Sequence, residues 1–119
     1  VVDLPDRLVV QKPAGWEVDQ YKLTGAEAGR KRLLSGYLEG LLPPRRWPIL
    51  CDSGHQFGFL HRIDVPCSGL ILTAKTYEAY RDLSLQLDAG RLLRDYLIAC
   101  HGWLGPSRRE VAERIFWPR

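Results

Sequence analysis

The chain has 119 residues, of which 45% are hydrophobic and 26% charged, as in a globular domain rather than a low-complexity chain. Three cysteines without a Cys-x-x-Cys pair argue against a disulfide scaffold and indicate a reducing, intracellular compartment. No apolar stretch approaches the roughly 18 residues of a membrane span, so no membrane partner is expected. The net charge of +3 selects no class of partner by itself.

The N-terminal half is predicted to contain one strand and one helix. Residues 7–11 read as a strand because three consecutive positions are apolar and two of them β-branched. The Lys-Pro-Ala-Gly sequence at 12–15 predicts a turn. Leucines and a tyrosine recur at helical spacing over 26–42, and the prolines at 43–44 end that helix. Residues 45–58 lack periodicity and are predicted to form a loop.

The C-terminal half is predicted to contain three strands and a second helix. Strands are expected over 58–64 and 69–74, on either side of a tight turn. Thr76 is a suitable N-cap for a helix that reaches Leu87, and Gly90 is a natural residue to end it. Residues 92–101 are apolar on both faces, which predicts a strand inside a sheet.

The most informative segment is 59–75, where Asp64 stands between an arginine-containing run and a Pro-Cys-Ser-Gly turn. An apolar run follows at once and is expected to be a buried strand. A carboxylate at a strand end, on a turn anchored by a rigid core, is well placed to be a nucleophile or base. The alternative is a carboxylate that only caps the turn through backbone N–H groups.

This segment resembles the signature of the RluA-like (RsuA/RluA) pseudouridine synthases, His-Arg-Leu-Asp-x-x-Thr-Ser-Gly followed by apolar residues and Ala-Lys. Ile63 replaces the Leu of that signature, and Cys67 replaces its Thr. The Lys-Pro-Ala-Gly turn also resembles a segment near the start of that family's catalytic domain, although the histidine that often follows it is missing from the sequence Trp-Glu-Val-Asp at 16–19. The matching residues of the signature are His61, Arg62, Asp64, Ser68, Gly69, Ala74 and Lys75.

The resemblance implies an α+β fold with a mixed, largely antiparallel sheet and flanking helices. It implies isomerisation of uridine to pseudouridine in RNA, with Asp64 as the catalytic aspartate and with no cofactor or metal. The RNA partner, ribosomal, transfer or messenger, is not specified. Residues 1–119 are interpreted as a synthase catalytic-like domain that is incomplete at its C-terminal end, because the family's later Thr-His-Gln-Ile-Arg-like motif has no counterpart. We therefore expect weak or no activity from this chain alone.

A second segment, 94–102, resembles the family's Lys-x-Tyr-x-Ala run, with Arg94 in place of the lysine. The resemblance makes Tyr96 a second catalytic candidate, because an aromatic ring can stack on the target uracil. The alternative is a core tyrosine of a buried strand. Arg62 can stack on bases or contact phosphate, or it can be a solvated arginine. His61, Ser68 and Arg94 complete the set of candidate RNA-binding residues, with His61 expected to orient the loop through hydrogen bonds.

Two other interpretations remain, and a zinc site is not expected. The histidines and cysteines match no zinc spacing, and buried thiols with hydrogen-bonded histidines are expected instead. The chain can also be a non-catalytic RNA-binding module derived from the same fold. A more remote alternative is an interaction domain that uses tryptophans as surface anchors. The tryptophans are Trp16, Trp47, Trp103 and Trp117.

Overall fold

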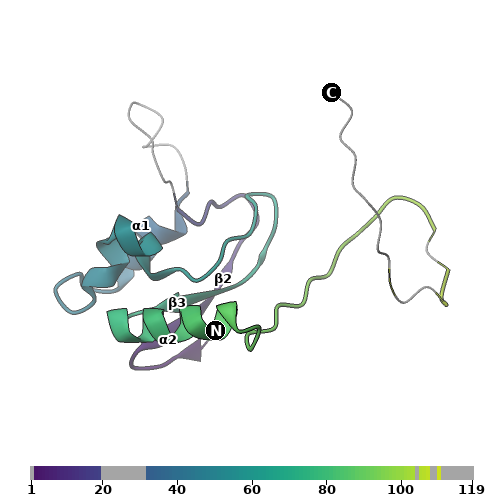
Figure 1. The fold of residues 1–119 in the computed structure, drawn as a ribbon. Coiled ribbons are helices and arrows are strands. Elements are labelled where there is room, and N and C mark those ends of the chain that lie inside the picture. Colours follow the sequence, from purple (N-terminus) through teal and green to yellow (C-terminus); the bar gives the residue numbers. More distant parts are fainter. Residues whose placement is uncertain (1, 20–31, 104, 108–109, 111–119) are drawn as a thin grey trace.

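The structure, a computed structural model, describes residues 2–19, 32–103, 105–107 and 110. Its centre is an antiparallel sheet in the order β1 (Val2–Asp3), β2 (Arg7–Lys12) and β3 (Gly69–Ala74) (Figure 1). β2 pairs with β3 along its whole length, from Arg7 opposite Ala74 to Lys12 opposite Gly69. The predicted strands over 7–11 and 69–74 are therefore confirmed, and β2 is one residue longer than expected.

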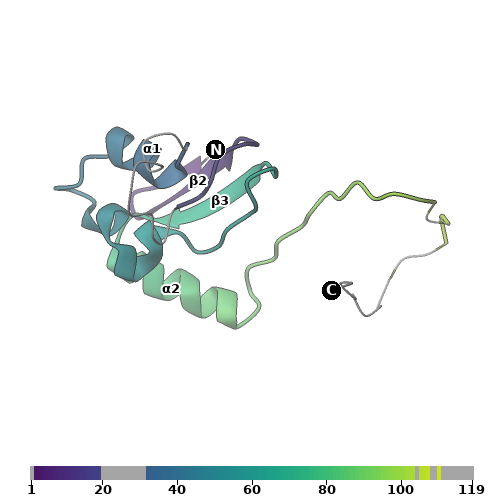
Figure 2. The same cartoon turned by 90° about the horizontal axis from the view of Figure 1, so that it is seen from above.

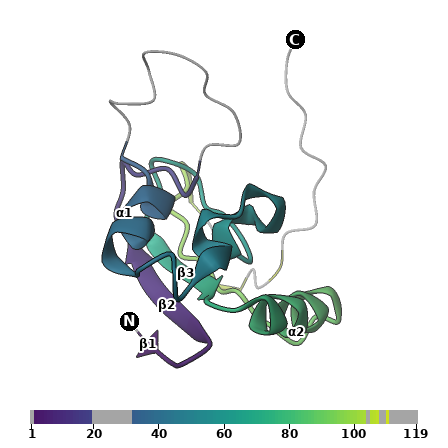
Figure 3. The ribbon, with the colours of Figure 1, turned by 90° about the vertical axis from the view of Figure 1, so that its left-hand side faces the viewer.

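Helices α1 (Leu34–Leu41) and α2 (Tyr77–Asp88) lie on opposite faces of this sheet (Figures 2 and 3). Side chains alternate between the two faces of a strand, so each face has its own apolar cluster. The cluster under α1 contains Leu8, Val10, Val18, Leu34, Leu38, Phe59 and Ile71. The cluster under α2 contains Leu60, Ala74, Ala79 and Leu83. The expected α+β class, with largely antiparallel pairing and flanking helices, is confirmed.

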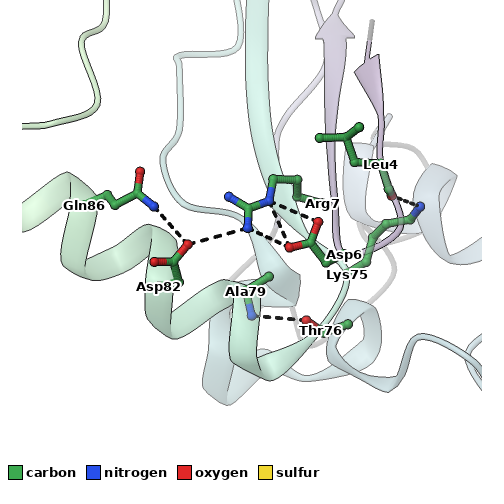
Figure 4. Close-up of polar contacts among 8 residues, drawn as sticks. All are labelled: Leu4, Asp6, Arg7, Lys75, Thr76, Ala79, Asp82 and Gln86. Carbon is green, nitrogen blue, oxygen red and sulfur yellow. Dashed lines mark hydrogen bonds and ion pairs between the residues drawn. The ribbon is translucent and has the colours of Figure 1, made fainter.

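The second helix begins and ends as the sequence predicts. The Thr76 hydroxyl accepts a hydrogen bond from the backbone N–H of Ala79 at 3.1 Å, and Gly90 has a positive φ of 67° just after the helix. Arg7 bonds to the carboxylate of Asp6 at 2.6 Å and lies 3.5 Å from that of Asp82, which joins β2 to α2 (Figure 4). The contact between Arg7 and Asp82 therefore helps to hold α2 against the sheet.

The first helix is shorter than the predicted range of 26–42. Residues 26–31 lie outside the described residues, and the helix begins at Leu34. Leu33 is extended, with φ −101° and ψ 130°, and it forms a parallel bridge with Glu17. Apolar spacing alone did not reveal that the backbone at Leu33 is used for this pairing. The predicted loop over 45–58 contains two short 3₁₀ elements, η1 (Pro48–Cys51) and η2 (Ser53–Gly58).

The strand predicted over 58–64 is wrong. Only Phe59 forms a bridge, to Thr73, and the N–H of Leu60 donates to the carbonyl of Leu72 at 3.1 Å. After Leu60 the backbone leaves the edge of β3, and the side chain of His61 takes the next hydrogen bond of that edge. Residues 61–64 therefore form a loop.

The strand predicted over 92–101 is also wrong. This segment has no regular secondary structure and runs away from the sheet after α2 (Figure 1). Tyr96 is 58% exposed, where a place inside a sheet predicts burial. A strand requires a hydrogen-bonding neighbour as well as apolar side chains, and composition reports only the second.

The three cysteines were expected to be buried, but Cys51, Cys67 and Cys100 are all exposed. No helix of the described residues is long and apolar enough to cross a membrane.

Gly58 is the point from which the chain enters the segment that carries Asp64. Its φ is +79°, and a Cβ there would collide with the backbone oxygen of Ala74. We expect Gly58→Ala to lower the free energy of unfolding by at least about 2 kcal/mol in urea denaturation, through backbone strain and displacement of β3. Gly40→Ala is the control, because it lies in α1 with open space around it and should be neutral or stabilising. Equal effects of the two substitutions would contradict the requirement for glycine at position 58.

Candidate active site

Asp64 lies on an exposed turn that leads into β3. The backbone carbonyl of Asp64 accepts a hydrogen bond from the N–H of Cys67 at 3.0 Å, so the turn closes without its carboxylate. Both Asp64 and Ser68 are exposed. The turn thus presents a carboxylate and a hydroxyl to solvent.

The turn is held by Lys12, a residue that the sequence analysis treated only as part of a turn motif. The side chain of Lys12 is completely buried. Its ammonium donates to the carbonyl of Trp16 at 2.6 Å, to that of Pro13 at 3.1 Å, and to that of Val65 at 3.4 Å. The N–H of Gly15 donates to the same Val65 carbonyl at 2.7 Å. The predicted turn at 12–15 and the turn after Asp64 are therefore one connected unit.

The register of β2 explains why a lysine points into the protein. Leu8, Val10 and Lys12 are all buried, as the period of two along a strand requires. Burial lowers the pKa of Lys12, and this effect is opposed by the neighbouring Cys67 and Asp64. The Lys12 ammonium is therefore close enough to the Asp64 carboxylate for their charges to interact. The sequence carries no signal for the burial of Lys12, because Leu8, Val9 and Val10 are consecutive apolar residues that do not alternate with polar ones.

Arg62 is bound by Asp19, which the sequence analysis did not identify as a site residue. One terminal guanidinium nitrogen of Arg62 donates to Oδ1 of Asp19 at 2.9 Å, and the other donates to its backbone carbonyl at 3.1 Å. The Asp19 side chain is only 3% exposed, while that of Arg62 is 50% exposed. Arg62 is therefore a half-exposed cation oriented by a buried anion, rather than a freely solvated arginine.

His61 contributes a hydrogen bond to the edge of β3. Its Nε2 accepts from the backbone N–H of Leu72 at 3.2 Å, which requires this nitrogen to be unprotonated. Burial lowers the pKa of His61, and the positive charge of Arg94 lowers it further. Nδ1 then carries the proton, and it is a buried atom without a hydrogen-bond partner among the described residues.

The structure gathers most of the predicted site residues but not all of them. Asp64 and Ser68 lie on or next to the turn, and His61 and Arg62 precede it in the same loop. Arg94 stands on the segment after α2, and its positive charge contributes to the lowered pKa of His61. Tyr96 stands on the exposed segment after α2, so its contact with a substrate remains a prediction. In the part of the chain that the structure describes, no three His, Cys, Asp or Glu side chains are grouped so as to hold a metal ion.

A model of one protein family, described as RNA pseudouridylate synthase, matches residues 6–115. The match includes the turn at 12–15, the Asp64 turn and the segment with Arg94 and Tyr96. No curated protein and no solved structure matches the chain.

The role of Lys12 in holding the Asp64 turn can be tested by local hydrogen exchange as well as by overall stability. We expect Lys12→Met to lower the free energy of unfolding by about 2 kcal/mol, because three carbonyls lose a charged donor. Hydrogen exchange measured by NMR should become faster at the amides of Gly15 and Cys67. Lys75→Met is the matched control, since the buried Lys75 binds Asp3 and Leu4 at the other end of β3. Equally fast exchange at Gly15 in both variants would contradict a local role for Lys12.

His61 should make stability depend on pH. Its pKa is lower in the folded chain than in the unfolded chain, so its contribution is complete above about pH 6.5 and is lost as the pH falls through the folded pKa. His61→Gln keeps an acceptor for Leu72 without titrating, so urea midpoints from pH 7 to 5 should fall less steeply in this variant. The exposed His101 gives the control, and His101→Gln should leave the slope of the parent unchanged. Parallel slopes for His61→Gln and the parent would refute the assignment.

Proposed function

Because the chain belongs to the RNA pseudouridylate synthase family, we propose that it isomerises uridine in RNA with the carboxylate of Asp64 as the catalytic group. We also propose that it belongs to the RluA-like class, on the basis of the signature at 61–69. RNA is the substrate class of the family, and the proposal assigns the chemistry to particular residues of this chain.

The reaction exchanges one glycosidic bond for another within a single nucleotide. The bond from ribose C1′ to N1 of the base breaks, the base turns, and a bond forms from C1′ to C5. The hydrogen at C5 leaves as a proton and N1 gains a proton, so no oxidant, reductant or hydrolytic water is consumed. The reaction needs a carboxylate beside C1′ and C6 and a surface that holds the RNA.

The observation that carries the proposal is the support of the Asp64 turn. Val65, the residue after Asp64, is held through its carbonyl by both the Lys12 ammonium and the Gly15 N–H. A catalytic group needs its backbone fixed while its side chain remains accessible, and the exposed carboxylate on this anchored turn meets both conditions.

The remaining candidates are assigned to RNA binding. Arg62 lies two positions before Asp64 and presents a half-exposed guanidinium, which suits a phosphate or an unstacked base. Ser68 is exposed next to the Asp64 turn, and Arg94 is exposed on the segment after α2. Tyr96 is proposed to stack on the target uracil, a role supported by its sequence context and its exposed ring. His61 is proposed to contribute by fixing the loop on which Arg62 stands.

Release of tritium from RNA labelled at uridine C5 follows the chemistry directly, because that hydrogen must leave. We expect release from RNA under single-turnover conditions, with protein in excess so that slow turnover is detected. Asp64→Asn should reduce the rate by at least about a hundredfold while RNA affinity stays within about threefold, because the amide cannot serve as base or nucleophile. Asp88→Asn, an exposed carboxylate at the end of α2, should match the parent.

Two outcomes would overturn the proposal. RNA binding without any tritium release would leave a non-catalytic RNA-binding module. Undiminished release from Asp64→Asn would assign the chemistry to another group.

A further inference from the structure

In the ion pair between Asp19 and Arg62, one partner is buried and the other is half-exposed. The Asp19 carboxylate is nearly inaccessible, at 3% exposure, while Arg62 keeps 50% of its side-chain surface. A buried carboxylate without a partner is costly, so Asp19 binds Arg62 firmly rather than leaving it to solvent. The exposed part of Arg62 is therefore held in a defined orientation.

Asp19 itself is fixed by the core. The N–H of Ser35 in α1 donates to the carbonyl of Val18 at 3.0 Å, and the N–H of Leu34 donates to that of Glu17 at 2.9 Å. Val18 is 1% exposed and belongs to the cluster under α1. The backbone next to Asp19 is therefore held in place, and the carboxylate in turn orients the guanidinium that it binds.

The guanidinium retains capacity for a second anion. It carries five N–H donors, and the bonds to Oδ1 and to the backbone carbonyl of Asp19 use two of them. The other three, including Nε–H, form no hydrogen bond with the described residues, and half of the Arg62 side-chain surface is exposed. The Nε–H edge of a guanidinium can donate two parallel bonds to one phosphate group. Arg62 also lies in the loop that leads to Asp64, so a phosphate bound there belongs to a nucleotide near the reacting one.

We infer that Asp19 is a positioning residue that holds the Arg62 guanidinium ready to bind a phosphate of the substrate RNA next to the target uridine. The inference rests on the proposed function, since it takes RNA as the ligand. Preorganisation of a flexible arginine removes part of the entropic cost of binding. The interaction therefore increases affinity even though it neutralises part of the charge of Arg62. A pure charge effect would act in the opposite direction.

The test is a double-mutant cycle on RNA affinity. The four proteins are the parent, Asp19→Ala, Arg62→Ala and the double variant, with a fluorescent uridine-containing RNA hairpin as probe at 150 mM salt. We expect Asp19→Ala to weaken binding about tenfold in the parent and to have no effect when Arg62 is already alanine. Asp88→Ala, which removes an exposed carboxylate, gives the effect of the charge change alone, and Arg81→Ala, which removes an exposed arginine, is the corresponding control for Arg62.

A measurement without RNA covers the case in which Arg62→Ala does not fold. In protein labelled with ¹⁵N-arginine, slow rotation should separate the guanidinium signals of Arg62, which the Arg62→Lys variant identifies. Asp19→Ala should merge these signals into the average of a freely rotating group. Rapid averaging already in the parent would overturn the inference.

The outcomes separate this inference from the function on which it rests. Tighter binding by Asp19→Ala would mean that Asp19 competes with RNA for Arg62, and equal weakening in both backgrounds would mean a structural role; either result overturns the inference. Lost tritium release with an intact cycle would overturn only the catalytic role of Asp64. Absence of RNA binding even at 25 mM salt would overturn both proposals.

Discussion

A buried ammonium group, that of Lys12, holds the site together. Removing a positive charge from water is costly unless hydrogen bonds replace the lost hydration, and an ammonium has three donors to satisfy. The three carbonyls that accept them come from Pro13, Trp16 and Val65, on two separate segments. The charge therefore requires those segments to stay together, and the turn that presents Asp64 depends on this requirement.

The elements that were predicted correctly are those determined by neighbouring residues in the sequence. β2 follows from consecutive apolar residues, and α2 follows from the Thr76 cap and helical spacing. The two strands that failed, over 58–64 and 92–101, have the right composition but lack a neighbouring ladder. Composition reports which side chains avoid water, and a strand also needs an edge that is open at the right place. That information is carried by the tertiary structure.

The same division applies to the site. The signature identified His61, Arg62 and Asp64 as a group, because these residues are adjacent in sequence. The groups that hold them are distant: Val65 is bound from Lys12 and Arg62 from Asp19, at separations of 53 and 43 residues. Neither Lys12 nor Asp19 has a signal of its own in the sequence. The apolar residues before Lys12 are consecutive and do not alternate with polar ones, and Asp19 stands in a short segment without periodicity.

Side chains rather than a strand ladder fix the loop from His61 to Val65. His61 occupies the edge of β3, Arg62 binds the segment before α1, and Val65 binds the end of β2. Each contact leaves backbone and side-chain atoms of the loop exposed, which a ladder with a neighbouring strand would cover. The contact of His61 also depends on its protonation state, because Nε2 must be unprotonated to accept from the N–H of Leu72. The geometry around Asp64 is therefore governed by charge and hydrogen bonding more than by apolar packing, which agrees with the RNA-binding role proposed for this loop.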